Sequence, residues 1–103
     1  MARVTWSPTA RIDYERLLTW IATEASLQTA LLWAAKIRAS VQVLEDFPEI
    51  GAPVEDTAQT GFRERLVGPY RIIYRYDGTK STIYYIARAE QDLGRILSPE
   101  DSL

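Results

Sequence analysis

The sequence has neither cysteine nor histidine among its 103 residues. Without cysteine the chain forms no internal disulfide and offers no thiolate to a metal or a substrate. Without histidine it lacks the usual imidazole base and metal ligand. These two absences exclude serine–histidine–aspartate catalysis, cysteine–histidine catalysis and zinc held by thiolates or imidazoles. We expect no cofactor and no metal.

Long apolar runs are also missing. No stretch approaches the roughly 18 apolar residues of a membrane-spanning helix. The opening MARVTWSPTARIDYERL lacks the apolar core of a signal peptide. We therefore expect a cytoplasmic protein without a membrane partner. What the chain does have is material for one core, since 47% of its residues are hydrophobic, and its length is typical of one small domain. We expect residues 1–103 to form a single domain.

Charge is divided unevenly along the chain. Residues 1–60 contain five basic and eight acidic residues, and residues 89–103 contain one basic and four acidic residues. Residues 61–88 reverse this balance, with six basic and two acidic residues. The basic part begins with RERLVGPYRIIYRY, which holds four arginines and three tyrosines in a chain of net charge −2. Such a local excess of one sign raises the question of a binding surface.

Two amphipathic helices are predicted in the first half. Ser7-Pro8 has the pattern of a helix start, because serine caps the first turn and proline suits it. Apolar residues then recur every three or four positions as far as Ala25. Ser26 has the same capping role for a second helix, whose apolar period continues until Pro48 prevents it. The short link between them predicts an antiparallel helical hairpin.

Strands are predicted at both ends of this hairpin. VTW is a short β-prone segment at the start, PEIGAPVEDTAQTG has no period and is expected to be a loop, and FRERLV, YRIIYRYD and STIYYIAR follow as three strands. The expected order is β-α-α-β-β-β. This is an α+β fold with a helical hairpin packed on a four-stranded, mainly antiparallel sheet. A short C-terminal helix is possible from Ala89 to Leu97, because Ser98-Pro99 would stop it.

The arginines of the basic part alternate with apolar residues. Because neighbouring side chains of a strand point to opposite faces, we expect the aromatic and aliphatic faces to meet the helices and the arginine faces to point outward. If the two strands pair about Gly68-Pro69, four arginines form one exposed cluster: Arg63, Arg65, Arg71 and Arg75. Guanidinium groups bind phosphates and carboxylates, so the cluster is a candidate binding surface. A solvated face with Glu64 and Asp77 as partners is the simpler alternative.

The sequence also resembles the RelE/ParE superfamily of toxins from bacterial type II toxin–antitoxin modules, and it is closer to ParE. The resemblance runs from Val4 to Leu93 and rests on the order of several motifs: WSPTARIDYERLLTWIA, FPEIG, FRERLV with YRIIYRY, and IYYIARAEQDL. No single motif is diagnostic, whereas their combination is specific. The fold that the resemblance implies agrees with the order of elements predicted above.

Function divides within this superfamily. RelE-like members are ribosome-dependent messenger RNA endonucleases that use basic and tyrosine side chains around the scissile phosphate, whereas ParE-like members act on DNA gyrase. Arg71 matches a sheet arginine of the nucleases, but the last-strand pattern appears here as Arg88-Ala89-Glu90-Gln91-Asp92, so that Glu90 and Gln91 replace two expected cations. Phosphate cleavage needs cationic stabilisation. An acidic chain of pI about 5.1 also suits ribosomal RNA poorly. We therefore favour a ParE-like stoichiometric inhibitor of gyrase over an enzyme.

The resemblance implies a hetero-oligomeric complex with a cognate antitoxin, ParD-like or similar. Operator DNA would be contacted only through that antitoxin. The candidate antitoxin contacts lie on the helical hairpin and the sheet: Trp20, Leu31, Trp33, Arg71 and Arg75. The candidate contacts with the target lie at the end of the last strand and beyond it: Arg88, Glu90, Asp92 and Arg95.

Two alternatives stay open from the sequence. A residual ribonuclease would gather cations around a phosphate, and its candidate residues are Arg63, Arg71, Arg75 and Arg88. A toxin-fold protein that has lost toxicity would still bind its partner but would be harmless when expressed alone. Cleaved transcripts on ribosomes would identify the first alternative, and normal growth on expression would identify the second.

Overall fold

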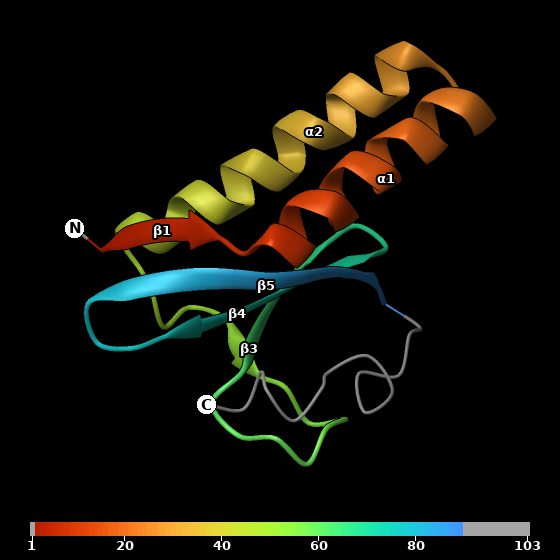
Figure 1. Cartoon of the computed structure of the whole chain (residues 1–103). Coiled ribbons are helices and arrows are strands. Elements are labelled where there is room, and N and C mark those ends of the chain that lie inside the picture. The colour runs from red at the N-terminus through yellow and green to blue at the C-terminus, as the bar shows by residue number, and fades with distance from the viewer. Residues whose placement is uncertain (1, 90–103) are drawn as a thin grey trace.

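The computed structural model describes residues 2–89 (Figure 1). The elements in chain order are β1 (Arg3–Trp6), α1 (Pro8–Glu24), α2 (Leu27–Gln42), the short 3₁₀ helix η1 (Val43–Glu45), β2 (Ala52–Pro53), β3 (Arg63–Val67), β4 (Tyr70–Tyr76) and β5 (Lys80–Arg88). The α+β fold class and the order of helices and main strands predicted from the sequence are confirmed. The helix expected from Ala89 to Leu97 lies outside the described residues.

The sheet has five strands in the order β1-β5-β4-β3-β2. β1 runs parallel to β5, and every other pair is antiparallel. The expected four strands were one too few, because Ala52 and Pro53 pair with Glu64 and Arg63 inside the segment predicted to be a loop. A two-residue strand has no detectable period, and proline is tolerated there because the strand lies at the edge of the sheet.

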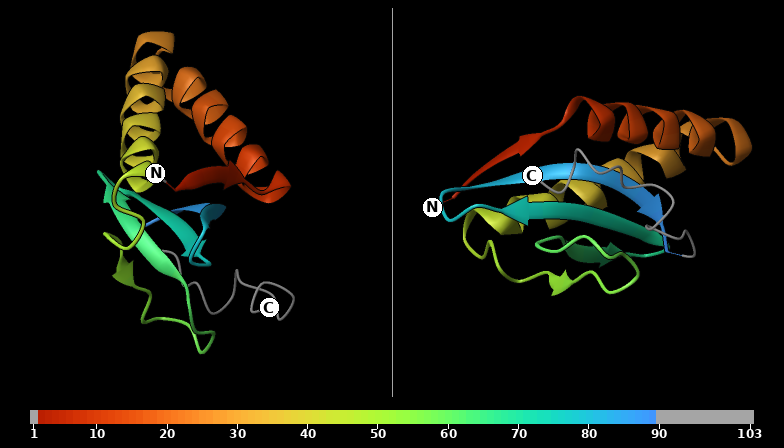
Figure 2. Two further views of the ribbon diagram at one scale, coloured as in Figure 1. Left: turned by 90° about the vertical axis from the view of Figure 1, so that its left-hand side faces the viewer. Right: turned by 60° about the horizontal axis from the view of Figure 1, so that its bottom comes forward.

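Both helices begin as the sequence predicts. The Ser7 hydroxyl accepts a hydrogen bond from the Ala10 N–H at 3.0 Å, and the Ser26 hydroxyl accepts one from the Thr29 N–H at 3.0 Å. The helices lie side by side near the turn that joins them and diverge towards β1, as the left view of Figure 2 shows. They cover one face of the sheet. None of the described helices is long and apolar enough to cross a membrane.

The main core lies between the hairpin and the sheet. Ile37 and Leu44 from the helical layer meet Ile72, Tyr74 and Ile83 from the central strands, and all five are fully buried. The aromatic and aliphatic face of β4 therefore meets the helices, as predicted. The Tyr74 hydroxyl donates to the Pro48 carbonyl at 2.8 Å and accepts from the Gly51 N–H at 2.8 Å. A side chain on Gly51 would lie 2.6 Å from that tyrosine, so only glycine fits this close approach.

The other face of the sheet is partly covered by the segment between β2 and β3, which lies on the side away from the helices in both views of the sheet (Figures 1 and 2). Phe62 from this segment packs with Ile73 and Ala87 in a second, smaller core. The register between β4 and β5 shifts between Ile73 and Tyr74, which leaves Tyr84 without a partner residue in that ladder. Tyr84 and Tyr85 both pack against the second core.

The predicted cluster of four arginines on one exposed face is wrong. Arg63 lies opposite Tyr74, and Arg65 lies opposite Ile72, so both belong to the helix side of the sheet. The Arg65 Nε donates to the Ser40 hydroxyl of α2 at 3.1 Å. The physical reason is the two-residue turn at positions 68 and 69, which pairs odd-numbered residues of β3 with even-numbered residues of β4.

Arg71 is also not exposed as predicted. Only 6% of its surface is accessible, because it lies under the segment between β2 and β3. Its guanidinium donates to both carboxylate oxygens of Asp56, at 2.9 and 2.8 Å, and its Nε and Nη2 both donate to one oxygen of Glu64. These bonds raise the pKa of Arg71 further above its usual range. Arg71 is thus the centre of a buried ion cluster that holds this segment against the sheet.

Candidate functional site: a groove in the helical hairpin

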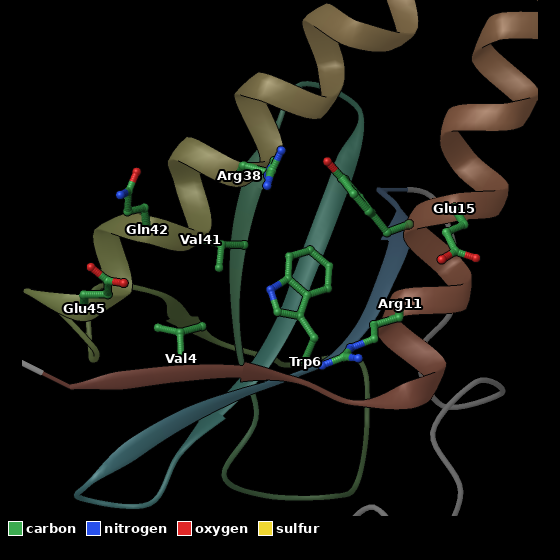
Figure 3. A pocket seen from close by; sticks show the side chains of 9 residues that line it. Val4, Trp6, Arg11, Glu15, Arg38, Val41, Gln42 and Glu45 are labelled. Atoms are coloured by element: carbon green, nitrogen blue, oxygen red, sulfur yellow. The ribbon is translucent and has the colours of Figure 1, made fainter.

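The divergence of the two helices leaves an open groove of about 680 Å³ above β1, shown in Figure 3. Three elements and the 3₁₀ helix supply its walls: Val4, Trp6, Arg11, Tyr14, Glu15, Arg38, Val41, Gln42 and Glu45. Trp6 lies on β1 and points into the middle of the groove in Figure 3. Its ring centroid is 5.2 Å from that of Tyr14, with the planes tilted by 55°. The groove therefore has an aromatic floor.

Local sequence explains why the groove forms at this end of the hairpin. The Tyr14 hydroxyl donates to the Ala34 carbonyl at 3.4 Å, which ties α1 to α2. Beyond that contact α1 must join β1 through Ser7, so its first turn stays beside the sheet edge. Burial raises the pKa of Tyr14, so the hydroxyl stays protonated and keeps its donor role at neutral pH. The groove is thus part of the fold rather than a gap left by one side chain.

The rim of the groove carries charges of both signs. Arg11 and Glu15 line it from α1, while Arg38 comes from α2 and Glu45 follows that helix. An apolar floor with a charged rim is the usual layout of a protein-binding site, because burial of the floor supplies most of the binding energy and the charges of the rim orient the partner. The arrangement suits an amphipathic peptide better than a small anion or a metal.

The outer surface of the hairpin is unusually apolar. Large exposed side chains come from both helices: Ile12, Trp20, Leu27, Leu31 and Leu32. Trp20 is 51% exposed and Leu31 is 61% exposed. Several large apolar side chains exposed on one two-helix unit indicate an interaction surface. Two of the predicted antitoxin contacts, Trp20 and Leu31, are therefore exposed, and their role stays a prediction.

Trp20 also borders a second cavity, of about 490 Å³, between α1 and the end of β5. The Arg88 guanidinium lies 5.8 Å from the Trp20 ring centroid. At the inner end, the Asp13 carboxylate accepts a hydrogen bond from the Ile86 N–H at 3.1 Å. Burial raises the pKa of Asp13, opposed by this hydrogen bond and by the charge of Arg16. Arg88, predicted to contact the target, thus lies on the hairpin side of the sheet.

The other predicted contacts are placed differently. Trp33 is half-buried and packs edge-on against Tyr70, with ring centroids 5.3 Å apart, while the Lys36 ammonium lies 4.8 Å above its ring. Contacts within the fold therefore cover much of the surface of the Trp33 side chain. Arg71 and Arg75 lie on the opposite face of the sheet from the hairpin. Their assignment to an antitoxin surface stays a prediction. Glu90, Asp92 and Arg95 lie outside the described residues.

The four arginines proposed for a ribonuclease do not converge. Arg63 donates to the carbonyls of Glu49 at 3.1 Å and Gly51 at 2.8 Å on the helix side of the sheet. Arg71 and Arg75 belong to the other side, and Arg88 lies over α1. No single phosphate is within reach of all four in this arrangement. Among residues 2–89 there is also no group of three or more acidic side chains that could hold a metal ion.

Sequence reasoning missed the groove. Val4 and Trp6 are two residues apart on β1, so their side chains point to the same face of the sheet. This alternation could have placed both on the helix side. The contribution of Tyr14 and Arg38 could not have been seen, because it depends on the angle at which the helices separate. No periodicity in the chain encodes that angle.

The protein is thus an α+β domain with a helical hairpin on one face of a five-stranded sheet, an open aromatic groove and exposed apolar side chains on its helices. Residues 4–97 match the family described as ParE toxin of type II toxin-antitoxin system, parDE. The chain therefore belongs to the ParE toxin family. A search of curated proteins returned no significant match.

Solved structures with the same fold include toxins of this superfamily. One is described as the chromosomal ParDE TA system from P. aeruginosa: it has a TM-score of 0.75 at 22% identity and covers 87% of this chain and 98% of its own. A YoeB dimer from Staphylococcus aureus has a TM-score of 0.56 at 20% identity, with coverages of 84% and 94%. A YoeB/ParE toxin from Agrobacterium tumefaciens has a TM-score of 0.57 at 16% identity, with coverages of 84% and 96%. These likenesses establish the RelE/ParE fold.

Proposed function

We propose that this protein is a ParE-type toxin that stops growth by binding DNA gyrase and blocking replication, and that a cognate antitoxin neutralises it by binding directly. The observation that carries the proposal is the family match over residues 4–97. The separation of Arg63, Arg71, Arg75 and Arg88 is the second support, because a ribonuclease needs cations gathered on one phosphate.

The antitoxin surface proposed here consists of the groove and the exposed face of the hairpin. The groove offers Trp6 and Tyr14 as an apolar floor, and Trp20 and Leu31 are exposed on the parts of the two helices closer to the turn that joins them. An amphipathic segment of an antitoxin fits such a surface, since its apolar side chains would enter the groove and its charged side chains would meet the rim. The match to a structure described as a ParDE TA system supports a partner of this kind.

Pulse labelling tests the proposed target. Cells are induced to make the protein without an antitoxin, and incorporation of labelled thymidine and methionine is followed at short times. We expect thymidine incorporation to fall first, because gyrase is needed for replication forks to advance. A supercoiling assay with purified gyrase and purified toxin is then the direct check. If methionine incorporation falls first, translation is the target and the gyrase proposal fails. Normal growth would instead support a partner-binding protein without toxicity.

The surface that binds gyrase is proposed to include Arg88 and the residues after it, among them Glu90, Asp92 and Arg95. Deleting residues 90–103 tests this assignment. We expect the truncated chain to lose toxicity while it still binds the antitoxin, because the proposed antitoxin surface belongs to residues 2–89. Retained toxicity would remove Glu90, Asp92 and Arg95 from the target surface. If the truncated chain loses both toxicity and antitoxin binding, circular dichroism shows whether it still folds.

A further inference from the structure

The turn that follows the helical hairpin, residues 45–50, exposes two large apolar side chains next to three carboxylates. Phe47 is 62% exposed and Ile50 is 49% exposed, and both line an open hollow of about 430 Å³. The carboxylates belong to Glu45, Asp46 and Glu49. We propose that the antitoxin segment that enters the groove continues over this acidic turn, where an apolar side chain flanked by basic ones binds. The inference rests on the antitoxin binding proposed above and adds a further surface to it.

The core does not account for the two apolar side chains of the acidic turn. Leu44, the residue before the turn, is fully buried, whereas Phe47 and Ile50 take no part in the cores of the described residues. The Ile50 N–H donates to the Phe47 carbonyl at 3.2 Å, so the two residues belong to one tight turn. An aromatic and an aliphatic side chain that share an exposed hollow are typical anchors of an interface.

Charge around the turn favours a basic partner. Residues 43–62 include five acidic residues and no basic one. Within the described part of the chain, neither Asp46 nor Glu49 forms an ion pair. Arg63 approaches from β3, but the bonds that it forms here go to two backbone carbonyls. Three carboxylates against one guanidinium leave a negative excess, which lysine or arginine side chains of a partner would complement.

Shared rim residues connect the acidic turn to the groove. Glu45 lines the groove, and Figure 3 shows it beyond Gln42, where α2 ends. Glu45 also lines a hollow of about 480 Å³ beside the start of β1. Asp46 and Pro48 border both this hollow and the one at Phe47. A segment that leaves the groove past Glu45 therefore reaches the acidic turn through neighbouring hollows.

The charges along this path tell which part of the partner segment must be basic. The groove rim mixes Arg11 and Arg38 with Glu15 and Glu45, so it suits a segment with charges of both signs. The acidic turn offers carboxylates only. We therefore expect the basic side chains at the end of the segment that lies beyond the groove, next to the apolar side chain that meets Phe47.

Hydrogen bonds hold the backbone of the acidic turn before a partner arrives. The Phe47 N–H donates to a carbonyl of η1 at 2.9 Å. The Tyr74 hydroxyl donates to the Pro48 carbonyl at 2.8 Å, and the Arg63 Nη1 donates to the Glu49 carbonyl at 3.1 Å. A turn fixed in this way loses little conformational entropy on binding, which favours affinity.

Titration calorimetry of the full-length protein with purified full-length antitoxin tests the apolar anchor. Phe47→Ser should weaken the affinity by about tenfold or more, because the interface loses an aromatic anchor. Leu66→Ser is the matched control, since Leu66 is 63% exposed on the face of the sheet away from the helices. It should change the affinity by less than about threefold.

Glu49→Lys tests the charge of the turn by the same titration. The affinity should fall by at least about fivefold in about 50 mM salt and by less in about 500 mM salt, because salt screens exposed charges. Glu55→Lys makes the same change at an exposed position between β2 and β3. This control should change the affinity by less than about twofold.

The outcomes separate the inference from the proposed function. Unchanged affinity in both Phe47→Ser and Glu49→Lys overturns the inference and leaves antitoxin binding in the groove intact. No binding by the unchanged protein contradicts the proposed function itself. A loss in Phe47→Ser alone would mean that the partner segment is not basic, which overturns the charge assignment. Variants that bind the antitoxin normally but no longer inhibit gyrase would assign the turn to the target instead. Circular dichroism of each variant shows that a loss of binding is not a loss of structure.

Discussion

At the scale of single residues, Arg71 is where the sequence and the structure differ most. The side chain occupies a strand position whose pattern predicted exposure, but Asp56 and Glu64 surround it, and its own side chain is only 8% exposed. The carboxylate of Asp56 comes from a segment without periodicity, 15 residues away in the chain. Nothing in the pattern of β4 predicts that a distant loop covers it. The face of the sheet to which each side chain of β4 points was predicted correctly, and only the loop that covers Arg71 was missed.

Replacing Arg71 tests how strongly this cluster holds the fold. Arg71→Met leaves two carboxylates together without their cation. Breaking a buried ion pair costs about 3–5 kcal/mol, and we expect about 2–3 kcal/mol here, since the Asp56 side chain is 40% exposed. Urea unfolding measures the change in the free energy of unfolding. Arg11→Met on the exposed side of α1 is the control and should change it by less than about 0.5 kcal/mol. An equal loss in both variants would show that the cluster contributes nothing specific.

Two aspartates should respond to pH with opposite signs. Burial raises the pKa of Asp13, so its ionisation above the unfolded value of 3.8 makes the folded state less stable as pH rises. Backbone hydrogen bonds lower the pKa of Asp77, so its stabilising contribution is present above 3.8 and is lost as pH falls through the folded pKa. The stability of Asp13→Asn relative to the unchanged protein should therefore increase as the pH rises from 3 to 7, by less than about 1 kcal/mol.

Asp77→Asn serves as the contrasting variant, with thermal unfolding measured at both pH values. Relative to the unchanged protein, it should lose stability at pH 7 and recover at low pH. The same direction of change in both variants would contradict the assignment of burial as the main cause at Asp13.

At the scale of elements, the turn between β3 and β4 fixes the position of the helical hairpin. Gly68 has a φ angle of +57°, and a Cβ there would lie 2.2 Å from the edge of the Trp33 ring. The turn therefore needs glycine both for its backbone and for its contact with α2. Trp33 in turn packs against Tyr70, the first residue of β4. This contact couples the turn, the strand and the helix.

Gly68→Ala and Gly78→Ala form a matched pair at this scale. Both glycines have positive φ angles, but a Cβ on Gly78 meets nothing within 4 Å. The Gly78 variant should lose about 1 kcal/mol from backbone strain alone. The Gly68 variant should lose at least about 2–3 kcal/mol, because Trp33 must also shift. Urea unfolding of both proteins gives the comparison. Similar losses would mean that Trp33 moves aside without cost.

Elements were predicted from the sequence wherever a local signal defines them. Ser7 and Ser26 cap the helices as expected, since capping depends on residues only three positions apart. The faces of β3 were assigned wrongly, although the turn length contained the answer: a two-residue turn places Val67 opposite Tyr70, and hence Arg63 opposite Tyr74. By contrast, no local signal reveals β2, whose two residues form a strand only because β3 lies beside them.

At the scale of the whole molecule, the two faces of the protein are expected to have separate roles. The hairpin face carries the groove and most of the exposed apolar side chains, whereas the opposite face carries the Arg71 cluster. Leu31 and Leu66 allow a direct comparison, because they are 61% and 63% exposed on opposite faces. A charge at either position should cost little stability, since neither side chain contributes to a core.

Leu31→Glu should escape neutralisation by the antitoxin, whereas Leu66→Glu should remain neutralised. The reason is that a carboxylate in an apolar interface loses its hydration without gaining a partner. We expect the affinity for the antitoxin to fall by at least about tenfold for the first variant and by less than about threefold for the second. Titration calorimetry with purified antitoxin measures both affinities, and growth on co-expression gives the cellular result. If Leu66→Glu is the variant that escapes, the antitoxin binds the opposite face.

The parallel pairing of β1 with β5 has a consequence for how the protein is made. The two strands join Thr5 to Thr82, which are 77 residues apart, so β1 has no strand to pair with until β5 has left the ribosome. Trp6 on β1 forms the floor of the groove, and the groove is therefore completed only after β5 has been made. A chain that still lacks β5 therefore has no finished groove. If the groove binds the antitoxin as proposed, the antitoxin cannot dock there before β5 has joined the sheet.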